Sequence, residues 1–136
     1  MTTRAVLDAS VVLKWFGEGE RHADLARRVG AAFEIGQLTV FAPPLLRTEV
    51  LNVAGRAWGW RERPLIDLAE EIDGMGFAYS EPDLADVARW TTRGLTAYDA
   101  TYVALAEAEA APLITDDDSI VAHAPEIAAP LSNWSI

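Results

Sequence analysis

The sequence predicts a single α/β domain, with a central, mainly parallel sheet of about four to five short strands flanked by helices. Short apolar runs alternate with longer helical patterns along the chain, an order typical of parallel sheets. The 136 residues contain 51% hydrophobic and 24% charged residues, a composition typical of a folded globular protein. No repeat or Gly/Ser linker divides them. We therefore expect one domain over residues 1–136.

The chain opens with a strand and two helices. A short apolar run at residues 5–7 predicts the first strand. A short helical segment follows at residues 11–16, and Gly17 is a stop signal for it. Apolar residues at helical spacing then predict an amphipathic helix over residues 21–35. This order is the first strand-to-helix unit of the expected sheet.

The middle of the chain continues the alternation. Residues 38–41 are expected to form a second strand, and Pro43-Pro44 opens the next helix because proline is tolerated in a first turn. Further helices are expected at residues 63–75 and 81–92.

The last third again pairs helices with strands. A helix is expected at residues 99–110 and a strand at residues 112–115. A short helix after Asp118 and a terminal strand near residues 131–136 complete the prediction.

Composition excludes several kinds of site. The absence of cysteine rules out disulfides, thiolate zinc sites and a cysteine nucleophile. The chain has neither an apolar leader nor a run long enough to cross a bilayer, so we expect a cytoplasmic protein that does not enter membranes. A net charge of -10 argues against broad nonspecific binding of nucleic acid.

Basic residues nevertheless gather near one segment. Ten of the eleven are arginines, and four of them lie around the Glu49 segment: Arg47, Arg56, Arg61 and Arg63. They could face a phosphate backbone, and Arg47 and Arg56 are the candidates for RNA contacts. Solvated arginines on a helix surface are an equally good interpretation of either residue.

Four carboxylates stand out because each lies where an apolar segment ends or a helix begins. Asp8 follows the first strand, Asp117 follows the strand at residues 112–115, and Glu49 and Asp99 lie in helical patterns. Ligands of open parallel sheets bind beyond the carboxyl ends of strands, so Asp8 and Asp117 are expected to meet. Crowded carboxylates have raised pKa values unless they share a cation, and a divalent metal is the simplest one.

Local interpretations remain open for these acids. Asp8 fits a helix N-cap as well as a metal ligand. Thr96 and Asp99 fit a capping box, which local evidence favours for Asp99. Glu49 shares a helical stripe with Leu45 and Val53 and needs a polar partner there.

Two stretches resemble a known family. The first stretch is residues 6–11 (VLDASV). The second is residues 95–106 (LTAYDATYVALA), with a continuation at residues 113–120 (LITDDDSI). Both stretches are similar to PIN domains, in particular the VapC-like toxins of bacterial toxin–antitoxin pairs. The match spans the whole chain and implies a PIN-like fold.

The resemblance assigns roles residue by residue. It implies that four acids are catalytic and bind metal, and these are Asp8, Glu49, Asp99 and Asp117. Asp116 is the rival for the fourth position. Ser10 and Thr115 match hydroxyl positions that hold metal-bound water or orient a carboxylate.

The implied activity is that of an endoribonuclease dependent on Mg²⁺, with Mn²⁺ as a substitute, because hard carboxylate oxygens select these ions. Water would attack the phosphorus and leave 5′-phosphate and 3′-hydroxyl ends. The implied partners are an RNA substrate, a VapB-like antitoxin and a second copy in a homodimer. Trp58 and Trp60 are candidates for an antitoxin groove or a dimer face, whereas Trp15 and Phe16 are expected in the core.

Other classes that gather acids at strand ends fit poorly. A response-regulator receiver needs a late lysine, but Lys14 is the sole lysine. A haloacid-dehalogenase-like phosphatase needs a second Asp two residues after the first, where this chain has Ser10. A catalytically inactive PIN-like module that binds a metal or a partner is the alternative that stays open.

Overall fold

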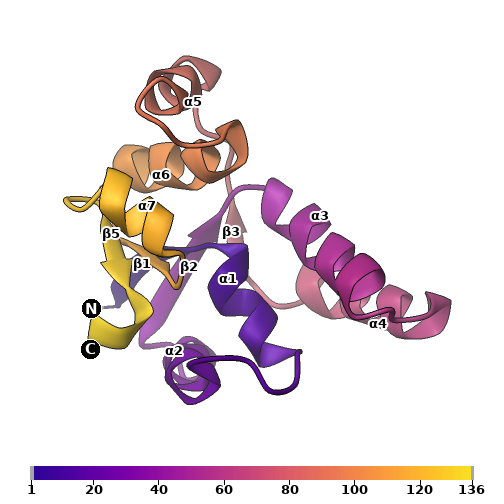
Figure 1. Ribbon diagram of the computed structural model, residues 1–136. Coiled ribbons are helices and arrows are strands. Elements are labelled where there is room, and N and C mark those ends of the chain that lie inside the picture. The colour runs from indigo at the N-terminus through magenta and orange to yellow at the C-terminus, as the bar shows by residue number, and fades with distance from the viewer. Residues whose placement is uncertain (1, 136) are drawn as a thin grey trace.

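The computed structural model describes residues 2–135 and contains one five-stranded sheet in the order β3-β2-β1-β4-β5, with every neighbouring pair parallel. The predicted α/β class is therefore confirmed (Figure 1). The strands are β1 (Thr3–Leu7), β2 (Leu38–Ala42), β3 (Ala78–Tyr79), β4 (Leu113–Thr115) and β5 (Ala128–Pro130).

Helices cover both faces of this sheet. In Figure 1, α2 lies below the strands, and α6 and α7 lie above them. The α-helices are α1 (Ala9–Val12), α2 (Ala23–Glu34), α3 (Leu45–Asn52), α4 (Glu62–Asp73), α5 (Leu84–Thr91), α6 (Ala97–Glu109) and α7 (Asp118–His123). Because both faces are covered, the second half of the central strand β1 is apolar, and its residues Ala5, Val6 and Leu7 are fully buried.

The sheet order fixes where a ligand site is expected. β1 pairs with β2 on one side and with β4 on the other, with Val6 opposite Leu113 and Leu7 opposite Ile114. From β1 the chain proceeds to β2, whereas from β4 it proceeds to β5 in the opposite direction. The carboxyl ends of β1 and β4 thus flank the topological switch point of the sheet.

Two strand predictions differ from the structure. The terminal strand predicted near residues 131–136 is wrong, because β5 lies earlier and residues 131–133 form a 3₁₀ turn; residue 136 lies outside the described residues. Ala128 and Ala129 have low strand propensity, so the sequence gives little indication of β5. The strand was predicted too late in the chain because the C-terminal segment contains larger apolar residues. The two-residue strand β3 was not predicted, since it is too short to show alternation.

Two helices also differ in form from simple α-helices. α1 has only four residues and continues as a 3₁₀ turn, Leu13–Trp15. α3 continues as a π-helical segment, Val53–Ala57, a form that occurs frequently at functional sites. Across residues 2–135, no helix is long and apolar enough to span a membrane.

Candidate active site

Asp8 lies directly beyond β1 at the centre of the sheet and is only 4% exposed. It occupies the N-cap position of α1, but its side chain makes no capping hydrogen bond. Ser10 Oγ donates to Asp8 Oδ1 at 2.6 Å, and Thr115 Oγ1 donates to Oδ2. Both carboxylate oxygens are therefore oriented by hydroxyl groups, one from α1 and one from the end of β4.

The environment of Asp8 disfavours its charged form. Burial raises its pKa to about 6, although the hydrogen bonds from Ser10 and Thr115 oppose this rise, and the charge of Asp117 adds to it. A buried carboxylate whose pKa is raised in this way is characteristic of a functional site.

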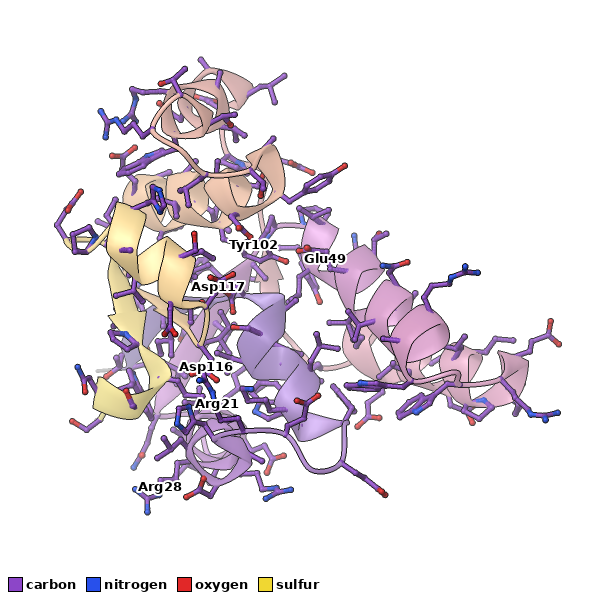
Figure 2. All side chains as sticks on the ribbon, viewed as in Figure 1. Arg21, Arg28, Glu49, Tyr102, Asp116 and Asp117 are labelled. Atoms are coloured by element: carbon purple, nitrogen blue, oxygen red, sulfur yellow. The ribbon has the colours of Figure 1, made fainter. Side chains whose placement is uncertain are left out.

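Glu49 lies on α3 and is half-buried. The hydroxyl of Tyr102, on α6, donates a hydrogen bond to Glu49 Oε1 (Figure 2). Burial raises the pKa of Glu49, the Tyr102 hydrogen bond lowers it, and the charge of Asp99 raises it further. Tyr102 is thus the polar partner that the apolar surroundings of Glu49 required.

Asp99 lies in the first turn of α6. Its backbone N–H donates to Thr96 Oγ1 at 3.1 Å, so Thr96 caps the helix as the local pattern predicted. The carboxylate is half-buried; burial and the charge of Asp117 raise its pKa, and the Thr96 hydroxyl lowers it. The cap therefore holds the backbone of Asp99 at the start of α6, where its charge interacts with those of Asp117 and Glu49.

Asp117 is the N-cap of α7, where its Oδ1 accepts from the backbone N–H groups of Ser119 at 2.9 Å and Ile120 at 3.4 Å. Its charge is the one that raises the pKa of both Asp8 and Asp99. In Figure 2, Asp117 lies between α7 and α1, on the side toward Tyr102 and Glu49. Asp117 therefore interacts electrostatically with Asp8 and Asp99, and Asp99 in turn with Glu49.

Asp116 belongs to a different group of side chains, here named the Lys14 cluster: Lys14, Arg21, His22 and Asp116. Asp116 Oδ2 lies 3.2 Å from Lys14 Nζ and 3.5 Å from Arg21, and Asp116 Oδ1 lies 2.9 Å from His22 Nδ1. Burial opposes the charged form, but the contacts with His22 and Lys14 hold the pKa of Asp116 below its ordinary value.

Ser10 connects the two groups. Its hydroxyl donates to Asp8 and accepts from the backbone N–H of Asp116 at 2.9 Å. The Lys14 cluster is therefore tied to the four acids through one side chain and one backbone amide.

The four acids form an electrostatic group that lacks protein cations. None of the ion pairs formed by residues 2–135 includes Asp8, Glu49, Asp99 or Asp117. In the same part of the chain, no three acidic or histidine side chains are close enough together to form a compact metal site. The donor set consists only of hard oxygens, which suits Mg²⁺ or Mn²⁺ rather than zinc.

The two candidate RNA-binding arginines lie apart from this group. Arg47 is 3.3 Å from Asp73, and its guanidinium lies 4.5 Å from the centre of the Tyr79 ring. Arg56 is exposed on the π-helical segment. Neither residue is paired with the four acids.

Sequence reasoning missed two contributors, Tyr102 and Lys14. Tyr102 follows Asp99 by three residues, a spacing that places both on one face of α6. Lys14 lies within the apolar segment at residues 11–16, and a buried basic residue requires an acid as its partner. Both signals were present in the sequence. However, Glu49, the partner of Tyr102, is 53 residues away in the chain, and Asp116, the partner of Lys14, is 102 residues away.

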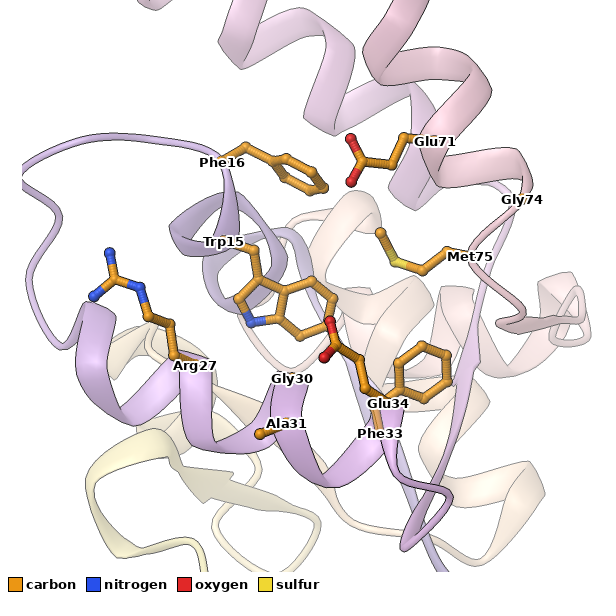
Figure 3. A pocket seen from close by; sticks show the side chains of 10 residues that line it. All are labelled: Trp15, Phe16, Arg27, Gly30, Ala31, Phe33, Glu34, Glu71, Gly74 and Met75. Atoms are coloured by element: carbon orange, nitrogen blue, oxygen red, sulfur yellow. The ribbon is translucent and has the colours of Figure 1, made fainter.

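A cavity of about 700 Å³ lies between the 3₁₀ turn that follows α1, helix α2 and the end of α4. Figure 3 shows Trp15, Phe16 and Met75 pointing into it, with Glu34 and Glu71 at its rim. Trp15 and Phe16 pack partly against the core, but they also line this cavity. Trp58 and Trp60 contact one another, with 5.6 Å between ring centres, and pack against the core.

Comparison with known proteins identifies the family of this fold. The family model described as PIN domain matches residues 5–125. No curated protein matches the chain.

Three solved structures share the fold. PAE2754 from Pyrobaculum aerophilum is 22% identical, with a TM-score of 0.67, and the alignment covers 97% of this chain and 93% of that one. Mycobacterium tuberculosis VapC20, described as a sarcin–ricin loop cleaving toxin, is 17% identical with a TM-score of 0.69, covering 87% and 93%. FitAcB from Neisseria gonorrhoeae is 15% identical with a TM-score of 0.67, covering 96% and 99%.

Proposed function

The chain belongs to the PIN domain family, and from this premise we propose that it is a Mg²⁺- or Mn²⁺-dependent endoribonuclease toxin of the VapC-like type, neutralised by a cognate antitoxin. One observation carries the proposal. Four acids from four segments act on one another electrostatically at the switch point of the sheet, and no ion pair formed within residues 2–135 includes them.

The protein's own side chains have separable tasks in this proposal. Asp8, Glu49, Asp99 and Asp117 would hold the cation. Ser10 and Thr115 fix the orientation of the Asp8 carboxylate through their hydroxyl groups. Tyr102 donates to one oxygen of Glu49 and leaves the other available as a ligand. A bound cation would neutralise the acids, stabilise charge on the phosphate and lower the pKa of a water molecule.

Metal-dependent RNA cleavage is the direct test. Purified protein is incubated with a structured RNA that contains an unpaired loop, in Mg²⁺, Mn²⁺ or EDTA. We expect cleavage with either metal, 5′-phosphate ends, and no cleavage in EDTA. Asp8→Asn and Asp99→Asn should each lower the rate at least ~100-fold, because each removes a charged ligand.

Asp24→Asn is a matched control, because Asp24 is an exposed acid in the first turn of α2. It should cleave at the wild-type rate. Cleavage that is as fast in EDTA, or equal rates in Asp8→Asn and the control, would contradict the metal-centred mechanism. If the wild-type protein cleaves RNA with neither metal, the inactive, partner-binding PIN-like module becomes the better interpretation. Expression without a partner should inhibit growth, and Asp99→Asn should relieve that inhibition.

The cavity of Figure 3 is the proposed contact site for the antitoxin. Its aromatic side chains, Trp15, Phe16 and Phe33, can accept apolar side chains, while Glu34 and Glu71 complement basic ones. The net charge of -10 also favours a basic partner. Replacement of Phe16 by Glu should weaken the complex without lowering RNA cleavage.

For the free protein we further propose a homodimer, which light scattering would detect as roughly twice the monomer mass of 14.8 kDa.

A further inference from the structure

A second, smaller pocket of about 380 Å³ is lined by Glu49, one of the four acids, and by the residues that follow Asp8 and precede Asp99. The floor of the pocket is one face of α3 and its π-helical continuation. Five residues form this face, and their spacing of three, one, three and one places them on the same side of the helix. These residues are Leu45, Thr48, Glu49, Asn52 and Val53. Ala9 and Tyr98 complete the wall, from the starts of α1 and α6. Glu49 therefore belongs both to the acidic group and to this pocket.

Tyr98 is the unusual member of the pocket. Its side chain is 64% exposed, which makes it one of the few large apolar side chains that the described part of the chain leaves in solvent. It directly precedes Asp99 in the first turn of α6. An exposed aromatic ring beside a catalytic acid offers a flat apolar surface to a substrate.

Thr48 and Asn52 add free polar groups on the same floor. Both residues are exposed, and neither side chain takes part in the hydrogen bonds formed within residues 2–135. Together they offer a hydroxyl and an amide, which can each donate and accept. Among the described residues 2–135, no lysine or arginine lines the pocket and Glu49 is the one charged residue that does, so the pocket suits a neutral ring better than a phosphate.

We propose that this pocket binds one unpaired nucleobase of the RNA next to the cleaved phosphodiester, with the base stacked on Tyr98 and its edge facing Thr48 and Asn52. The inference rests on the proposed nuclease function, and it adds that the RNA substrate is unpaired where it is cleaved. Base stacking on an aromatic side chain tolerates any base, whereas hydrogen bonds to the base edge select among bases. Because a base within a duplex has both faces occupied, the substrate is single-stranded or looped at the cleavage position.

Binding can be measured separately from cleavage. In an Asp8→Asn background, which keeps the RNA intact, fluorescence anisotropy with a labelled single-stranded RNA hexamer reports affinity. Adding Tyr98→Ala should weaken binding about tenfold, equivalent to about 1.4 kcal/mol. Tyr98→Phe should bind like the parent, because it keeps the ring. Leu84→Ala is the matched control, since Leu84 is 80% exposed at the start of α5, outside the pocket.

A hexamer with 2-aminopurine at successive positions locates the base. Stacking on Tyr98 should quench the fluorescence of one position, and Tyr98→Ala should abolish that quenching while Tyr98→Phe retains it. Unchanged affinity and quenching in Tyr98→Ala would overturn the nucleobase site. The exposed ring would then be better explained as a contact with another protein.

Cleavage by the wild-type protein with Mg²⁺, assayed in parallel, tests the nuclease function on its own. A cleaving wild type with an unaffected Tyr98→Ala refutes the pocket alone, whereas an inert wild type refutes the nuclease.

Discussion

Asp116 and Asp117 are neighbours in the chain but belong to regions of opposite electrostatic character. Asp116 lies in the Lys14 cluster, where its side chain is 8% exposed and that of Lys14 is 9% exposed. Asp117 interacts with Asp8 and Asp99, which form no ion pair within residues 2–135; burial raises the pKa values of these two acids, and the charge of Asp117 adds to the rise. Asp116 is thus paired with a cation of the protein, whereas the next residue, Asp117, interacts with other acids.

The difference separates a structural role from a functional one. A buried acid with a protein cation holds its charge and secures the loop beyond β4. Acids without one store unfavourable repulsion, which a bound cation can relieve. Consequently the Lys14 cluster should influence stability, and the four acids should influence metal binding and catalysis.

The largest effect is expected from breaking the Lys14 cluster. Asp116→Asn leaves the ammonium group of Lys14 nearly buried without an acid, so we expect the free energy of unfolding to fall by about 3 kcal/mol. Denaturant unfolding at pH 7 measures this change. Asp117→Asn is the matched control, since asparagine caps a helix about as well as aspartate, and it should change stability by less than about 1 kcal/mol.

Equal losses in the two variants would contradict the assignment of Asp116 to structure and Asp117 to the site. A further check replaces Lys14 by Met in the Asp116→Asn protein. This change removes the uncompensated charge and should restore part of the lost stability.

The sequence predicted the parts of the site that depend on local pattern. The strand before Asp8, the helix cap at Thr96 and the placement of an acid beyond β4 follow from short stretches of chain. It could not distinguish Asp116 from Asp117, because their difference depends on Lys14 and His22, about a hundred residues earlier. The short strands β3 and β5 were missed or displaced because pairing with their neighbours, rather than side-chain pattern, defines them.

An intermediate effect is expected from metal binding. At a Mg²⁺ concentration about ten times its Kd, the wild-type protein should gain about 1.4 kcal/mol of stability, since only the folded chain holds the acids together. Thermal unfolding in EDTA and in Mg²⁺ measures the gain. Asp99→Asn should lose most of it, whereas the already less stable Asp116→Asn should retain it. A gain lost equally in both variants would mean that the Lys14 cluster also serves the metal.

The smallest effect is expected from pH, and it has opposite signs in the two regions. The pKa of Asp8 rises from 3.8 to about 6 on folding, so between these values the folded protein binds more protons than the unfolded chain. The stability of the metal-free protein should therefore fall as pH rises through this window, by about 1 kcal/mol from pH 5 to pH 7. Glu49 and Asp99, whose pKa values are also raised, act in the same direction.

Asp116 behaves in the opposite way, because its pKa is lowered. Its stabilising contribution is complete above its ordinary value of 3.8 and is lost as pH falls through the lower folded value. Unfolding in EDTA from pH 7 to pH 5 should thus show stability rising in the wild type and in Asp116→Asn, but rising less in Asp8→Asn. An equal rise in Asp8→Asn would show that Asp8 is not the group that takes up the proton. With saturating Mg²⁺ the trend should reverse, because protons then compete with the cation for the same oxygens.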